Sequence, residues 1–156
     1  MMSVVILMSV GERKVSGFTL IELLVTLAVM VILATVAVPG FQSMMASNRL
    51  ASDFNEIFTG LNFARSEAIK RRENVTFKIE SGKPWSYEVT ASNTIRTRAG
   101  SSGSVEASGD LEITFNSRGL VESPDCSDDG CSIIVNHSSV GSRTISISSF
   151  GRVGRE

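Results

Sequence analysis

The most informative segment of this chain is Ser16-Gly17-Phe18-Thr19-Leu20-Ile21-Glu22. Two basic residues, Arg13 and Lys14, precede it, and an apolar run from Phe18 to Val38 follows, in which Glu22 is the only charged residue. A helix of about 21 residues is about 31 Å long, which matches the hydrocarbon core of a lipid bilayer. The run therefore predicts a membrane-spanning helix.

Glu22 is unexpected inside such a run. An ionised carboxylate costs about 2.5–3.5 kcal/mol at the centre of a membrane helix and less near its end, so its presence predicts a partner for the charge. Two simpler interpretations do not need an acidic residue. One is an ordinary secretory signal peptide cleaved after Thr35-Val36-Ala37, although the run is longer than a usual h-region, and the other is a plain membrane anchor.

The segment Gly17-Phe18-Thr19-Leu20-Ile21-Glu22-Leu23-Leu24 resembles the class III signal of type IV pilins and type II secretion pseudopilins. The resemblance implies that a prepilin peptidase cleaves between Gly17 and Phe18 and methylates the new amino terminus of Phe18. It also implies that Glu22 pairs with the terminal ammonium of a neighbouring subunit in the filament. The apolar start, residues 1–7, departs from the short polar leaders of this class, which makes Met8 an alternative start to Met1.

Charge and chain order predict the compartment. Arg13 and Lys14 before the span place the N-terminus in the cytoplasm by the positive-inside rule, and the remainder then lies in the periplasm, outside the inner membrane. The formal net charge of the whole chain is −1, so a nucleic-acid site would have to be local.

The two cysteines, Cys126 and Cys131, flank a four-residue insert, Ser-Asp-Asp-Gly. In an oxidising compartment this pattern favours a small disulfide loop. The alternative is a metal site with the neighbouring aspartates, but two thiolates without a nearby histidine make an incomplete zinc site, and the aspartate spacing does not match an EF-hand. We predict the disulfide, and no metal or cofactor.

Periodicity after Pro39 predicts that the helix continues. A proline inside a helix removes one hydrogen bond, so we expect a kink or loosening there. Beyond it, apolar residues recur at three- and four-residue steps as far as Ile69, and charged residues, Asp53 and Glu67 among them, fill the remaining positions. We predict one helix from Phe18 to Arg71.

After Asn74 the period changes to two, which indicates β-strands. A hairpin turn is predicted at 81–84, and 99–109, rich in glycine and serine, is predicted to be a mobile loop. The predicted class is α+β, a long N-terminal helix on a small antiparallel sheet or sandwich. The strands are expected at 75–79, 85–89, 94–98, 111–116, 131–136 and 144–150. The expected divisions are the leader 1–17, the spanning helix 18–39, its amphipathic continuation 40–73 and the β-domain 74–156.

A second resemblance narrows the family. The helix end Leu61–Arg71, the strand and turn Ile113–Gly119 and a final strand closing in Gly151–Val153 are similar to the GspH/FimT group. That group holds minor pseudopilins of type II secretion and FimT-like minor pilins. The resemblance implies an assembly component without enzymatic activity, whose partners are the prepilin peptidase and other pilin or pseudopilin subunits. His137 is the sole histidine, no Gly-x-Ser-x-Gly motif occurs, and we interpret His137 as structural.

The C-terminus suggests an alternative role. Gly151-Arg152-Val153-Gly154-Arg155 resembles the Gly-Arg-x-Arg element with which some FimT-like minor pilins bind DNA during uptake, although Arg155 is displaced by one position. Together with Arg143, these arginines are candidate DNA contacts on a flexible tail, and Arg96, Arg98 and Arg118 would extend the patch if the fold gathers them. The competing interpretation is an ordinary solvated tail. The sequence leaves open whether the filament is a pilus or a secretion pseudopilus.

Overall fold

The structure is a computed structural model that describes residues 17–109, 111–123, 126 and 130–156. The chain divides into two compact units, Met1–Pro39 and Gly40–Glu156. Within the described residues the order of elements is α1 (Leu20–Arg71), β1 (Val75–Glu80), β2 (Ser86–Thr90), β3 (Thr94–Ala99), β4 (Val105–Gly109), β5 (Glu112–Phe115), β6 (Cys131–His137), β7 (Gly141–Ile147) and β8 (Val153–Arg155).

The described residues of the N-terminal unit are the first part of α1 and residues 17–19 before it. The helix begins at Leu20, two residues later than predicted, and it ends at Arg71 as predicted. The apolar side chains from Phe18 to Val38 are exposed. The described residues contain one helix, α1, that is long enough and apolar enough to cross a membrane. The helix α1 continues through Pro39, because one proline removes a single hydrogen bond while the neighbouring residues keep theirs.

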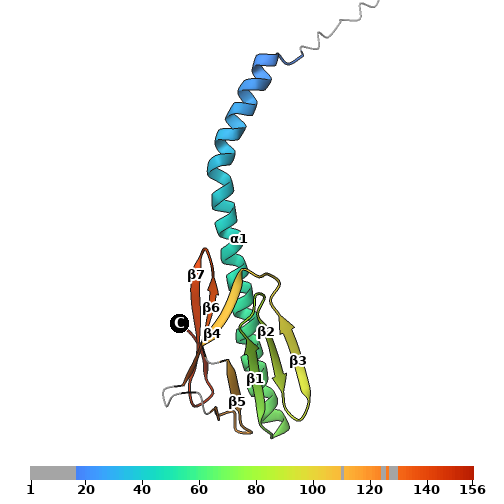
Figure 1. Cartoon of the computed structure of the whole chain (residues 1–156), viewed down its shortest axis with the longest axis vertical. Coiled ribbons are helices and arrows are strands. Elements are labelled where there is room, and N and C mark those ends of the chain that lie inside the picture. The colour runs from blue at the N-terminus through green and yellow to red at the C-terminus, as the bar shows by residue number, and fades with distance from the viewer. Residues whose placement is uncertain (1–16, 110, 124–125, 127–129) are drawn as a thin grey trace, which may run out of the picture. The chain divides into compact units, whose positions relative to one another are not determined.

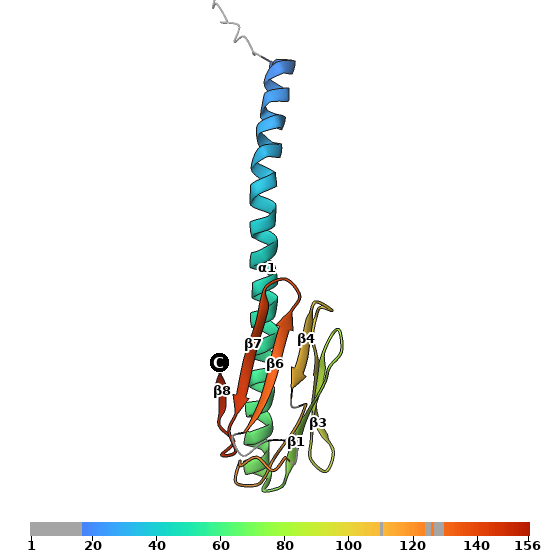
Figure 2. The ribbon, with the colours of Figure 1, turned by 60° about the vertical axis from the view of Figure 1, so that its left-hand side comes forward.

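The unit Gly40–Glu156 combines the second part of α1 with two antiparallel sheets. One sheet has the order β3-β2-β1-β5 and the other has the order β4-β6-β7-β8. Figure 1 shows β1, β2 and β3 beside the green part of α1, and the turned view in Figure 2 shows β8 at the edge next to β7. The predicted hairpin is confirmed, since β1 and β2 pair antiparallel across residues 81–85.

The core of this unit lies between the helix and both sheets. From α1 it includes Phe54, Ile57 and Leu61, and these pack with buried residues of the two sheets. Close packing requires a glycine at position 60, because a Cβ there would lie 2.7 Å from Cζ of Tyr87. The remaining fully buried large side chains are Trp85, Tyr87, Phe77, Phe115, Ile79, Ile113, Ile133, Ile145, Ile147 and Val75. The predicted α+β class is confirmed, with two sheets around one helix.

Two segments differ from the sequence-based expectation. The predicted mobile loop 99–109 contains β4, in which Val105 and Ala107 are completely buried and the strand pairs with β6. The predicted strand 144–150 ends at Ile147, where the chain turns back and forms β8 against β7. The C-terminus is therefore a paired strand and not the flexible tail that we predicted. Position 154 in β8 favours glycine, because a Cβ at this position would lie only 2.8 Å from Oγ of Ser146.

Candidate functional site

The predicted cleavage point lies outside the helix. Gly17, Phe18 and Thr19 precede the first helical residue, and Phe18 is 85% exposed. The peptide bond between Gly17 and Phe18 is thus not engaged in α1. Residues 1–16 of the predicted leader 1–17, including Arg13 and Lys14, lie outside the described residues.

Glu22 has a partner within its own chain. Its Oε2 lies 3.5 Å from the backbone nitrogen of Thr19, and Oγ1 of Thr19 accepts a hydrogen bond of 3.2 Å from the backbone N–H of Glu22. This reciprocal arrangement is a capping box at the start of α1. The sequence analysis did not identify it, although Thr19-Leu-Ile-Glu22 matches the required spacing. A local role of Glu22 at the helix start therefore has to be separated from a role between subunits.

The two cysteines are joined. The structure contains a disulfide between Cys126 and Cys131, whose Cα atoms are 4.9 Å apart. Cys131 is the first residue of β6 and is 5% exposed, so the bond ties the segment after β5 to the second sheet. The aspartates 125, 128 and 129 lie outside the described residues, and within those described no group of three metal-ligating side chains occurs.

Two of the three candidate DNA-contacting arginines converge on α1. The guanidinium carbon of Arg155 lies 4.5 Å from the ring centroid of Phe58 and 5.9 Å from that of Phe54. Arg143 lies 5.9 Å from the same Phe54 ring. In the described part of the chain, neither arginine has a carboxylate within salt-bridge distance. Strand pairing and cation–π contacts therefore place both exposed guanidinium groups 5.9 Å from the same Phe54 ring centroid.

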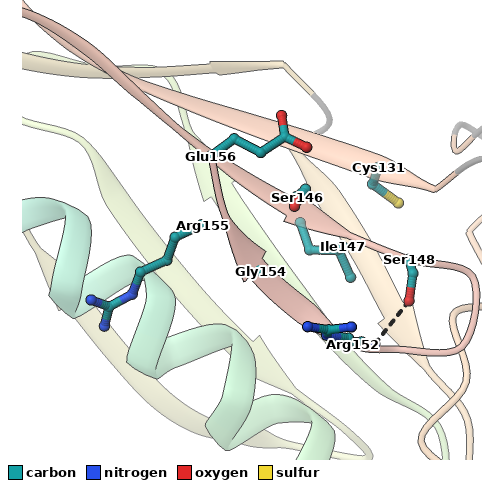
Figure 3. Close-up of a pocket in the computed structure, with 8 residues that line it drawn as sticks. All are labelled: Cys131, Ser146, Ile147, Ser148, Arg152, Gly154, Arg155 and Glu156. Atoms are coloured by element: carbon teal, nitrogen blue, oxygen red, sulfur yellow. Dashed lines mark hydrogen bonds between the residues drawn. The ribbon is translucent and has the colours of Figure 1, made fainter.

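Arg152 does not join this pair. Figure 3 shows Arg155 pointing toward α1, whereas Arg152 lies at the other end of β8, beside Ser148. Arg152 lines a cavity of about 420 Å³ together with Arg155 and Glu156. Arg143 and Arg155 therefore share a contact with Phe54, whereas Arg152 shares only the cavity with Arg155.

Arg96 and Arg98 are occupied elsewhere. Nη2 of Arg96 lies 3.4 Å and Nε of Arg98 lies 3.7 Å from Oε1 of Glu56. The hydroxyl of Tyr87 donates a hydrogen bond of 3.0 Å to the same oxygen. Burial, followed by this contact, raises the pKa of Tyr87 to about 12. These two arginines therefore attach the first sheet to α1 and do not extend the basic pair.

A buried polar group lies between α1 and the sheets. Asp53 is 6% exposed, and neither its Oδ2 nor Nε1 of Trp85 makes a hydrogen bond of normal geometry in the described structure. Burial raises the pKa of Asp53, while the nearby Trp85 indole and His137 imidazole partly oppose that rise. His137 is 5% exposed at the end of β6, where its Nδ1 accepts a hydrogen bond of 3.2 Å from the Ser139 backbone.

We expect Asp53→Asn to stabilise the domain at pH 7. A carboxyl whose pKa is raised on folding contributes most below its unfolded pKa, and that contribution is lost as pH rises through the folded value. The neutral amide avoids burying a charge, so the free energy of unfolding should rise by about 1 kcal/mol at pH 7, and the gain should shrink toward pH 4. Urea denaturation of a fragment starting at Gly40 at both pH values measures this. The exposed Glu112→Gln is the control, and an equal gain at pH 4 would contradict the burial argument.

Comparisons with known proteins agree with this architecture. The family described as Type II transport protein GspH matches residues 53–151, and the prokaryotic N-terminal methylation motif matches residues 13–38. A comparison with curated proteins finds no match.

Two crystal structures of the type IV minor pilin FimU from Pseudomonas aeruginosa share the fold. The first has a TM-score of 0.59 at 21% identity and covers 70% of this chain and 90% of the FimU chain. The second has a TM-score of 0.55 at 24% identity and covers 68% and 91%, respectively. These likenesses show a pilin-like α+β fold. Because the first family match spans well over half of the sequence and follows a methylation motif at the N-terminus, this chain belongs to the family of the type II transport protein GspH.

Proposed function

We propose that this chain is a minor pilin or pseudopilin, an assembly component of a type IV pilus or of a type II secretion pseudopilus. The main support for the proposal is that one chain contains both an apolar N-terminal helix and a family domain. An exposed apolar helix with a methylation motif at its start continues into a domain of the GspH family. Such a chain is suited to anchoring first in the inner membrane and then in a filament. The role is structural, as befits this family and fold.

Processing and topology follow from the N-terminal segment. A prepilin peptidase cleaves between Gly17 and Phe18 and methylates Phe18, the N-terminus stays on the cytoplasmic side, and the β-domain is periplasmic. The exposure of Phe18 and the non-helical backbone before Leu20 support access of the peptidase. The disulfide between Cys126 and Cys131 fits an oxidising compartment.

Cross-linking in cells tests the assembly role and distinguishes the two systems. A photo-reactive residue in place of Ser52, on the exposed face of α1, should capture neighbouring subunits in sheared filaments. Pilus subunits as the captured partners would assign the chain to a type IV pilus, and secretion pseudopilins would assign it to type II secretion. Absence of the chain from both kinds of filament, with normal membrane levels, would contradict the proposal.

DNA capture is the second candidate function. It is favoured by the convergence of Arg143 and Arg155 over the Phe54 ring, where neither cation is neutralised by a described carboxylate. Guanidinium groups contact phosphates through paired donors, and two such contacts give weak, salt-sensitive binding. Arg152, which lies apart, contributes as a further contact only if the nucleic acid extends along β8.

We expect the double substitution Arg143→Gln and Arg155→Gln to weaken duplex DNA binding by about tenfold or more at low salt. It should also reduce the slope of log affinity against log salt by about 2, since two phosphate contacts are lost. Fluorescence titration of the fragment from Gly40 measures both effects. The control is Lys78→Gln with Lys83→Gln, which removes the same charge from two exposed lysines. Equal weakening by both double substitutions, or no binding by the unchanged fragment, would remove the DNA role.

A further inference from the structure

A cavity of about 450 Å³ lies between α1 and the turn that joins β6 to β7. One wall is the first part of the domain helix and includes Phe41 and Met45. The other wall is polar and includes Ser104, His137 and Ser139. The cavity is thus apolar on one side and rich in hydroxyl groups on the other, which is the pattern of a site for an amphipathic molecule.

The cavity also carries positive charge. Arg49 lines it, and among the residues that the structure describes this guanidinium has no carboxylate partner. His137 is 5% exposed, and its Nδ1 accepts the hydrogen bond from the Ser139 backbone, so the ring proton belongs on Nε2. Two nitrogen donors and serine hydroxyls can surround a phosphate. The carboxyl next to His137 is Asp53, which is buried.

The positions of the cavity-lining residues along the chain indicate which class of ligand the cavity would bind. Phe41 follows Pro39, the last residue of the N-terminal unit, by two residues, and the apolar run before Pro39 is long enough to span a bilayer. Phe41, Met44 and Met45 extend the exposed apolar surface beyond that run. Arg49 lies eight residues after Phe41, about 12 Å along a helix, and side chains on a helix tilt toward its N-terminus. Apolar contacts therefore come first in the chain and the cation second, the order of acyl chains and phosphate in a lipid leaflet.

We propose that this cavity binds the headgroup of an anionic phospholipid while the subunit resides in the membrane. Arg49 and His137 bind the phosphate, the hydroxyl of Ser104 donates a further hydrogen bond, and Phe41 and Met45 contact the upper part of the acyl chains. Bound lipid fixes the domain close to the membrane surface before assembly. The inference rests on the membrane anchoring proposed above and goes beyond it, since an anchor alone needs no headgroup site.

The sole histidine provides a direct readout. The full-length chain in maltoside micelles, which contain no phosphate, is titrated at fixed pH with phosphatidylglycerol while the ring resonance of His137 is followed by NMR. We expect a saturable shift at about one lipid per chain, and a much smaller shift with phosphatidylcholine, whose choline offsets the phosphate charge. Glycerol phosphate tests for a free-phosphate site, and a shift as large as that with phosphatidylglycerol would overturn the lipid assignment.

Matched variants test the residues. Arg49→Gln should weaken the apparent affinity for phosphatidylglycerol about tenfold, the typical effect of losing one charge-assisted hydrogen bond. Arg118→Gln, which removes the same charge from an exposed position outside the cavity, should change nothing. Equal affinities of the Arg49 and Arg118 variants would overturn the proposal. The near-ultraviolet signal of Trp85, the single tryptophan, verifies that each variant is folded.

Two further measurements separate the alternatives. Flotation with phosphatidylcholine vesicles tests anchoring alone, and a chain that fails to float refutes the anchoring and not the headgroup site. If the His137 ring resonance does not shift with lipids but shifts when another pilin subunit is added, the cavity is a subunit interface and the lipid proposal is wrong.

Discussion

Gly17→Glu should leave the precursor uncleaved and absent from filaments. By resemblance to the pilin class, the peptidase accepts only a small residue before the cleaved bond. The bond itself is open to a protease, because residues 17–19 precede the helix and Phe18 is 85% exposed. Intact mass of the chain extracted from membranes distinguishes precursor from processed protein, and we expect the processed form to fall below detection.

Gly17→Ala is the matched control for this prediction. It adds one methyl group in open space, since nothing lies within 4 Å of a Cβ at this position, so cleavage should continue at a reduced rate. The unchanged protein should begin at Phe18. A mature terminus near Val38 would instead identify an ordinary signal peptide and refute prepilin processing.

Glu22→Gln should reduce incorporation into filaments more than tenfold without changing membrane insertion. Gln retains an oxygen that can accept from the Thr19 N–H, so the capping box at the start of α1 is preserved. Only the charge is lost, and a neighbouring subunit's terminal ammonium would remain unpaired in an apolar environment. An unpaired charge there costs about 2.5–3.5 kcal/mol, which corresponds to more than tenfold in an equilibrium.

Glu22→Ala separates the two roles of this side chain. It removes both the charge and the cap, and loss of a helix cap costs about 1 kcal/mol. If pairing between subunits dominates, the Gln and Ala variants should be equally defective when filament and membrane fractions are quantified by immunoblot. If Gln assembles normally and only Ala fails, Glu22 acts through the capping box of its own helix.

The charged positions on the domain helix show where periodicity misleads. We placed Asp53 and Glu67 on the polar side of an amphipathic helix, and both are buried. A helix that packs on one sheet buries one stripe, but α1 contributes to a core shared with two sheets, so the buried arc is wider. Glu67 is neutralised locally by Lys70 and Arg71, whereas Asp53 has no such partner among the described residues.

Sequence motifs predicted the family, and local patterns predicted the long helix as far as Arg71, the hairpin of β1 and β2 and the α+β class. These features depend on composition and on periods of two or 3.6 residues, which are local. The capping box of Thr19 and Glu22 was equally local and could have been predicted.

Local sequence patterns did not reveal β4, the extent of β8, the shared contact of Arg143 and Arg155 with Phe54, or the cavity beside Arg49. Val105–Gly109 is short and rich in small residues, and it is a strand because β6, which is distant in the sequence, offers it hydrogen-bonding partners. Val153–Arg155 pairs with β7, which precedes it closely in the sequence, across a turn. Arg155 lies in the last strand and Phe58 in the helix, so the contact between them exists only after the sheets have packed on α1. The pairing of β4 with β6 and the contacts of Arg143 and Arg155 with the helix join residues that are distant in the sequence, and no local pattern in this sequence encodes them.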